Sequence, residues 1–123
     1  MKMYIGKVKE NAKEGFEKIA GMDLLVLDVY ENNENFCLAY PTNLDDFEKY
    51  FKIMFEDWGK EWINEDYKYF LEYILNPDCE LISSINKEYL EDLRELTKED
   101  DNKICKALCE FKIKHKLNIE RFQ

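Results

Sequence analysis

Apolar residues near the start of the chain are spaced in a way that predicts a helix. They recur at steps of three and four, at Ile5, Val8, Ala12, Phe16 and Ile19. This spacing places apolar side chains on one helical face, and Gly21 just beyond them is a helix stop signal. We therefore predict an amphipathic helix over residues 5–19. The alternative interpretation is that residues 3–8 form a short strand, which a shorter helix follows.

Two runs of β-branched and apolar residues come next, at Leu24–Tyr30 and Phe36–Tyr40. The polar segment Asn32–Asn35 lies between them, and a polar connection between two such runs predicts a β-hairpin. The first run is apolar at both alternating sets of positions, which indicates a strand covered on both faces. Residues 79–85 are a candidate third strand.

The middle of the chain predicts two helices. Thr42 and Asp45 resemble a capping box with Asp in place of Glu, and we expect a helix to begin there. Its apolar face carries Phe47, Phe51, Met54, Phe55, Trp58 and Trp62, with Gly59 bending or ending the helix. A second helix is expected from about Glu65 to Leu75, stopped by Asn76-Pro77. Its inward residues are Tyr67, Phe70, Leu71 and Ile74.

The last third of the chain predicts two more helices. The first is capped by Ser84 and has an apolar face of Ile85, Tyr89, Leu93 and Leu96. The second is capped by Thr97 and Asp100, and its inward face carries Ile104, Ala107, Leu108 and Phe111. The expected fold class is therefore α+β: one helix-dominated domain over residues 1–123. It contains a small antiparallel β-hairpin or three-stranded sheet (about residues 24–40, possibly 79–85) packed by four to five helices.

Charge narrows the range of partners. The formal net charge is −9, yet residues 103–121 hold six basic and two acidic residues, so the rest of the chain is more acidic than the total indicates. An acidic body repels phosphate groups, which argues against direct nucleic-acid binding. It attracts a basic protein surface and speeds the encounter with it. Acidity also serves solubility, and a basic final helix packed on the acidic body explains the charge split without a partner.

Most catalytic and metal chemistry lacks its sequence signature here. His115 is the only histidine and lies among Lys112, Lys114 and Lys116, whose charges disfavour the imidazolium of a general base. The four cysteines, Cys37, Cys79, Cys105 and Cys109, lack the paired spacing of a zinc site, so we interpret them as reduced, buried thiols. The four glycines form no phosphate-binding motif. We expect no cofactor, no metal, no membrane span and a cytoplasmic location.

The segment from Asp45 to Tyr73 holds ten of the eighteen aromatic residues and nine acidic residues. Tyr69 and Tyr73 are spaced i, i+4 and are expected to point away from the apolar stripe of their helix. Aromatic anchors with an acidic rim are typical of protein recognition, although a neighbouring helix that covers the two tyrosines is an equally good interpretation. The candidate partner-binding residues are Asp45, Asp46, Glu48, Glu56, Asp57, Glu61, Glu65, Asp66, Tyr69 and Tyr73.

In physical type the chain is similar to protein antagonists such as phage-encoded DNA mimics, anti-CRISPR-type inhibitors and toxin-immunity proteins. This likeness rests on small size, acidity and aromatic content, and on no shared motif. Our leading hypothesis is an inhibitor that blocks a basic nucleic-acid-binding or active-site surface of a partner protein. The alternatives are a non-catalytic structural or adaptor protein that acts as a homodimer, and an enzyme of unrecognised type.

Overall fold

The computed structural model describes residues 2–29, 34–76 and 83–117, apart from the Trp58 side chain. Its centre is a five-stranded antiparallel sheet with the order β4-β3-β2-β1-β5. The strands are β1 (Lys2–Val8), β2 (Asp23–Asp28), β3 (Asn35–Pro41), β4 (Ser83–Asn86) and β5 (Leu90–Glu95). The first strand in the sequence therefore lies inside the sheet, between β2 and the last strand.

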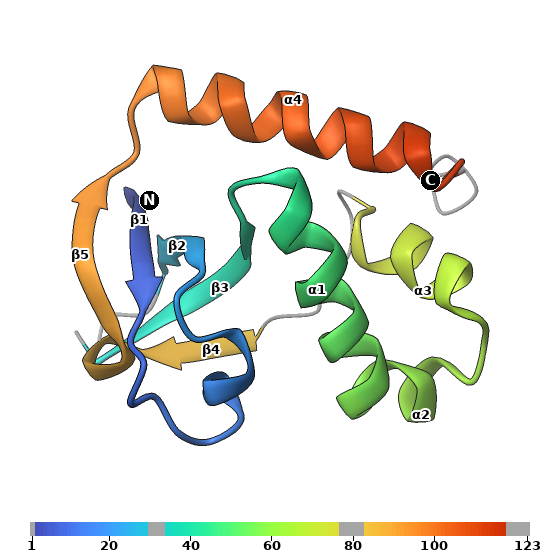
Figure 1. Cartoon of the computed structure of the whole chain (residues 1–123), viewed down its shortest axis with the longest axis horizontal. Coiled ribbons are helices and arrows are strands. Elements are labelled where there is room, and N and C mark those ends of the chain that lie inside the picture. Colours follow the sequence, from blue (N-terminus) through green and yellow to red (C-terminus); the bar gives the residue numbers. More distant parts are fainter. Residues whose placement is uncertain (1, 30–33, 77–82, 118–123) are drawn as a thin grey trace.

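The helices form a group beside the sheet, and one long helix joins the two parts. They are α1 (Leu44–Met54), α2 (Lys60–Ile63), α3 (Tyr67–Ile74) and α4 (Lys98–Lys114). A π-helical turn, η2 (Phe55–Gly59), connects α1 to α2, and the 3₁₀ turns are η1 (Phe16–Ile19) and η3 (Lys87–Tyr89). Figure 1 shows α4 running from the end of β5 past α1 toward α3.

Apolar residues on the two faces of the sheet enter two separate clusters. On one face, Leu24, Val26 and Phe36 pack with α1, α3 and α4, whose fully buried rings are Phe47, Phe51, Phe70 and Phe111. On the other face, Ile5 and Leu25 pack with Ile104 from the first half of α4. The prediction that the first hairpin strand is covered on both faces is confirmed for β2, because Leu24 and Leu25 are both buried.

The α+β class and the hairpin are confirmed, since β2 and β3 pair antiparallel. The expectation of a helix-dominated domain with a small hairpin is wrong, because the sheet has five strands. The error begins at residues 5–19, where the predicted helix is β1 followed by a loop and η1. Ile5 and Val8 fit a helical spacing by coincidence, since they lie in the two different clusters. The alternative of a strand over residues 3–8 was the correct one.

The helix predicted over Ile85–Leu96 is also wrong. Ser84 lies within β4 instead of capping a helix, and Leu93 is an exposed residue of β5. The register between β1 and β5 shifts between Ile5 and Lys7. Asp92, in the part of β5 opposite this shift, has a φ of 54°. The candidate strand over residues 79–85 is confirmed at residues 83–85, and residues 79–82 lie outside the described part. The helix capped by Thr97 and Asp100 is confirmed, with both hydrogen bonds of the capping box present.

The helix expected from Thr42 begins one residue later than the predicted cap. Asn43 is the N-cap residue, and its side-chain oxygen accepts a hydrogen bond from the Asp46 backbone N–H. The α-helix ends at Met54, where the π-helical turn begins. Trp62 was expected in the core and is instead 55% exposed, so that assignment is wrong. The same assignment for Trp58 concerns a side chain outside the described part.

Candidate functional site

A large aromatic side chain is exposed where α2 meets α3, and it is the most exposed one among the side chains that the structure describes. Trp62 is 55% exposed and packs edge-to-face on Tyr73, with ring centroids 5.4 Å apart. Asn64, with a φ of 53°, ends α2 in the left-handed conformation and lets the chain turn back into α3. We call this surface, made of Glu61, Trp62, Glu65, Asp66, Tyr69 and Tyr73, the α2–α3 corner.

The corner owes its shape to close packing between the η2 turn and α3. Gly59, the last residue of η2, lies so near the fully buried Phe70 ring that an added Cβ would be 2.6 Å from Phe70 Cδ1 and closer still to Cε1. Asp66 starts α3 by accepting a hydrogen bond from the Tyr69 backbone N–H at 2.8 Å. Tyr69 and Tyr73 are each half-buried in the fold, so neither ring projects fully into solvent.

Several of the predicted partner-binding carboxylates already have partners within the chain. Asp46 and Asp66 serve the helix caps, Glu56 pairs with Lys60 at 3.1 Å, and Asp57 pairs with Lys18 at 2.8 Å. Glu48 pairs with Lys114 and His115 at the end of α4, which is not part of the corner. Within the described residues, Asp45, Glu61 and Glu65 are exposed and make no hydrogen bond or ion pair. Glu61 and Glu65 lie at the corner, whereas Asp45 lies at the start of α1.

A second feature ties the end of α4 to α1. His115 Nε2 lies 2.7 Å from Glu48 Oε1, and Lys114 Nζ lies 3.0 Å from the same oxygen. The imidazole also packs against Phe111, with ring centroids 4.5 Å apart. Burial acts to raise the pKa of the Glu48 carboxyl, but the hydrogen bonds from His115 and Lys114 outweigh it, so the pKa is lowered. The predicted packing of a basic final helix on the acidic body is present in this contact.

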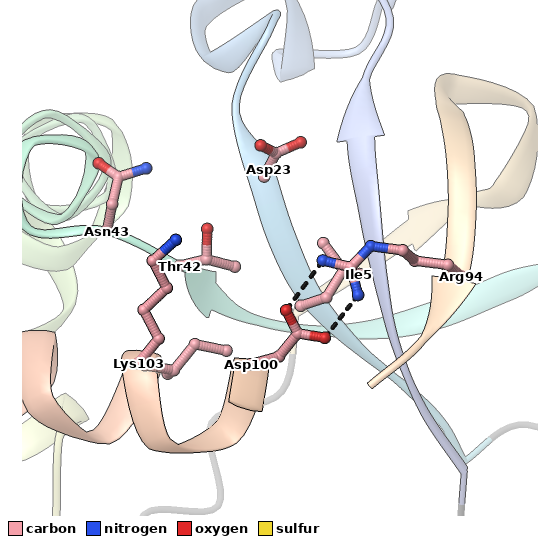
Figure 2. A pocket seen from close by; sticks show the side chains of 8 residues that line it. Ile5, Asp23, Thr42, Asn43, Arg94, Asp100 and Lys103 are labelled. Carbon is pink, nitrogen blue, oxygen red and sulfur yellow. Dashed lines mark hydrogen bonds and ion pairs between the residues drawn. The ribbon is translucent and has the colours of Figure 1, made fainter. Parts of the chain in front are cut away.

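A polar pocket of about 210 Å³ opens where β1, β2, β5, the start of α1 and the start of α4 converge. Its lining residues are Ile5, Asp23, Thr42, Asn43, Arg94, Asp100, Lys103 and Ile104. Figure 2 shows Arg94 and Asp100 joined on one side of the opening, with Asp23 on another side and Lys103 and Thr42 on a third. These residues come from five segments that are far apart in the sequence, and the strand order of the sheet brings them together.

Arg94 and Asp100 form a bidentate ion pair in this pocket. The two terminal guanidinium nitrogens donate to the two oxygens of Asp100, one of them at 2.9 Å. Asp100 also accepts hydrogen bonds from the Thr97 backbone N–H and hydroxyl. The hydrogen bonds from Arg94, and then those from Thr97, hold the pKa of the Asp100 carboxyl well below its usual range. This pair fixes the start of α4 against β5.

The cysteine and metal predictions have separate outcomes. Cys37 is a buried free thiol, and burial raises its pKa. Cys105 and Cys109 are exposed free thiols, so the prediction that they are buried is wrong. Cys79 lies outside the described residues. Over residues 2–29, 34–76 and 83–117, no group of three or more His, Cys, Asp or Glu side chains is arranged to hold a metal ion, and no helix is long and apolar enough to cross a membrane.

No protein-family model matches the chain, and comparisons with curated proteins and with solved structures gave no match. The site assignments therefore rest on geometry. Sequence reasoning missed the exposure of Trp62 and the whole polar pocket. One available signal was Arg94, one of only two arginines in a chain with 18 basic residues. The planar guanidinium forms bidentate pairs that lysine cannot form, so Arg94 was a candidate position for such a pair.

Proposed function

We propose that this protein is a small acidic inhibitor that binds through the α2–α3 corner to a basic surface of a partner protein. The partner surface would be one that normally holds nucleic acid or an acidic substrate. The exposed Trp62, flanked by the carboxylates of Glu61 and Glu65, is the observation that carries this proposal.

More than half of the Trp62 side chain is exposed to water, so much of its apolar surface does not stabilise the chain. Burying a large aromatic side chain contributes about 1.5–3 kcal/mol, and this stabilisation is only partly realised in the isolated chain. Tryptophan and tyrosine are also the residues most often found at the energetic centre of protein interfaces. The edge-to-face contact with Tyr73 favours one orientation of the Trp62 ring, which lowers the entropy lost on binding.

The charges around Trp62 favour a basic partner. Glu61 and Glu65 are exposed, and neither carboxylate pairs with a residue of the described chain. Their charges are thus available to Lys or Arg side chains of another protein, and the net charge of −9 adds long-range attraction. Such a pairing speeds association and selects the partner more than it strengthens the final complex.

The proposal is tested by affinity capture from the native source with matched baits. The wild-type protein is compared with Trp62→Ala and with the double reversal Glu61→Lys/Glu65→Lys, and retained proteins are identified by mass spectrometry at low and high salt. A matched control is Glu91→Lys/Glu110→Lys, since both residues are exposed on other surfaces and the net charge changes equally. We expect a basic protein to be retained by the wild type and by the control, and lost from both corner variants.

Two outcomes would contradict the proposal in different ways. Retention of the same partner by the corner reversal and by the control reversal would show that the corner is not the binding surface. If the affinity for that partner does not fall as ionic strength rises, recognition by charge is ruled out, because salt screens exposed charges. Sedimentation of the wild type and of Trp62→Ala at micromolar concentration tests the alternative that the protein is a homodimer. A dimer that the substitution dissociates would assign Trp62 to self-association.

A further inference from the structure

The polar pocket contains charges that its own ion pair does not neutralise. Arg94 and Asp100 satisfy one another through two parallel hydrogen bonds. The two remaining charged side chains of the lining are the carboxylate of Asp23 and the ammonium of Lys103. Within the described residues, neither of them makes a hydrogen bond or an ion pair. The pocket therefore offers one negative and one positive group, on different sides of one opening (Figure 2).

The position of Asp23 is fixed by the sheet. It is the first residue of β2, is half-buried, and lies opposite Lys7 of β1. No ion pair joins the two side chains, although opposite charges in cross-strand positions commonly pair. Asp23 instead lines the pocket, close enough for its charge to contribute to the raised pKa of Arg94, after the larger effect of the Asp100 hydrogen bonds. An unpaired carboxylate in an open pocket is available to accept hydrogen bonds from a ligand that displaces water.

The other lining residues set the size and the polarity of a ligand. Ile5 and Ile104 are buried and give the pocket an apolar wall, while Thr42 adds a hydroxyl group beside the start of α1. The volume of about 210 Å³ corresponds to ~7 water molecules. It is smaller than the pockets that hold drug-sized molecules, which begin at about 300 Å³. The ligand must therefore be a small molecule.

We propose that this pocket binds a free α-amino acid with a small aliphatic side chain. Asp23 accepts hydrogen bonds from the ligand ammonium, Lys103 and the Thr42 hydroxyl donate to its carboxylate, and the side chain lies against Ile5 and Ile104. A dipolar ligand matches the pocket better than a simple ion does. Asp23 and Asp100 repel an anion such as phosphate, and Arg94 and Lys103 repel a cation. This inference does not depend on the α2–α3 corner.

The test is a titration of the ¹⁵N-labelled full chain followed by NMR, with L-valine as the probe. Two analogues of equal shape serve as controls: N-acetyl-L-valine lacks the ammonium and L-valinamide lacks the carboxylate. Each is added to about 10 mM, which detects a Kd near ~1 mM. We expect L-valine to shift the backbone signals of Asp23, Thr42 and Lys103 in a saturable way. Each analogue should bind at least about tenfold more weakly, because one charge-assisted contact is lost.

Variants of the pocket then test whether the charges of Asp23 and Lys103 bind the ligand. Asp23→Asn and Lys103→Gln should each weaken L-valine binding about tenfold or more. The matched controls Asp28→Asn, at the other end of β2, and Lys106→Gln, one turn along α4, should leave it unchanged. The proposal is overturned if L-valine causes no saturable shifts, if N-acetyl-L-valine or inorganic phosphate binds as well as L-valine, or if the pocket and control variants behave alike. Two-dimensional spectra of each variant verify the fold before titration.

Discussion

Substituting Gly59 with Ala should destabilise the protein, although helix propensity alone predicts the opposite. Gly59 lies in a helical conformation, with a φ of −59°. In an ordinary helix, replacing Gly with Ala stabilises by up to about 1 kcal/mol. Here the new methyl group would lie 2.6 Å from Phe70 Cδ1 and 3.0 Å from Cζ, and closer to Cε1. Phe70 is fully buried, so its ring cannot move away without displacing other core residues or leaving the core.

The steric cost of the added methyl group decides whether the substitution stabilises or destabilises the protein. Forcing an extra methyl group into a packed interior costs about 1–3 kcal/mol, and we place a contact this short with a buried ring at the upper end of that range. Subtracting the propensity gain of about 1 kcal/mol leaves a net loss of ~1–2 kcal/mol. For a chain of this length, that loss lowers Tm by roughly 4–10 °C.

The assay is thermal and urea unfolding of wild type and variants, followed by circular dichroism. Gly6→Ala is the control, because its added Cβ meets the side chain of Leu93 at 3.0 Å and Leu93 is 42% exposed and free to rotate away. We expect Gly6→Ala to change stability less than Gly59→Ala. Combining Gly59→Ala with Phe70→Leu should cost less than the sum of the two single changes. A Gly59→Ala variant as stable as the wild type would refute the reasoning.

Three further outcomes follow from the described contacts. Because the pKa of Glu48 is lowered in the fold, its contribution to stability is complete above the ordinary carboxyl pKa of 4.5 and is lost as pH falls through the folded value. Unfolding free energies measured between about pH 6 and pH 3 should therefore fall less steeply for Glu48→Gln, and parallel curves would contradict this. Tyr50→Phe removes a buried hydroxyl that has no hydrogen-bond partner among the described residues, so it should be neutral or stabilise by up to ~1 kcal/mol in urea unfolding. A clear loss of stability would instead indicate a partner for that hydroxyl. In the native protein Cys105 and Cys109 are exposed and should react with iodoacetamide in minutes, as peptide mass spectrometry would record, while the buried Cys37 should react only on unfolding.

Local patterns in the sequence predicted the elements whose residues interact mainly with near neighbours. The capping box at Thr97, the hairpin of β2 and β3 and the helix at α3 all depend on contacts within a short segment. The strands β1 and β5 depend on each other across most of the chain, and periodicity cannot reveal that pairing. In β5 the residues Leu90 and Leu93 keep a helical spacing, yet Leu90 is buried and Leu93 is exposed.

The position of Trp62 was mispredicted for a definable reason. A straight α-helix places Trp62 on the same face as Phe55, seven residues earlier. The π-helical turn at Phe55–Gly59 takes about one residue more than an α-helical turn. All later side chains are thereby rotated by about 100°, which is one residue's step around the helix. The candidate interaction surface thus depends on a local irregularity, and the polar pocket depends on the sheet topology, neither of which a regular pattern encodes.

The place of β1 inside the sheet sets the order in which the protein can form during synthesis. β1 can pair with β2 early, but its other edge stays open until β5 has been made. At ordinary translation rates that interval is roughly 4–16 seconds. During it, Ile5 lacks the cover of Ile104, and an unpaired strand edge with apolar residues is prone to join other chains. A chain whose synthesis stops before β5 is complete would therefore keep this edge of β1 unpaired, and we expect such a truncated chain to aggregate more readily than the whole one.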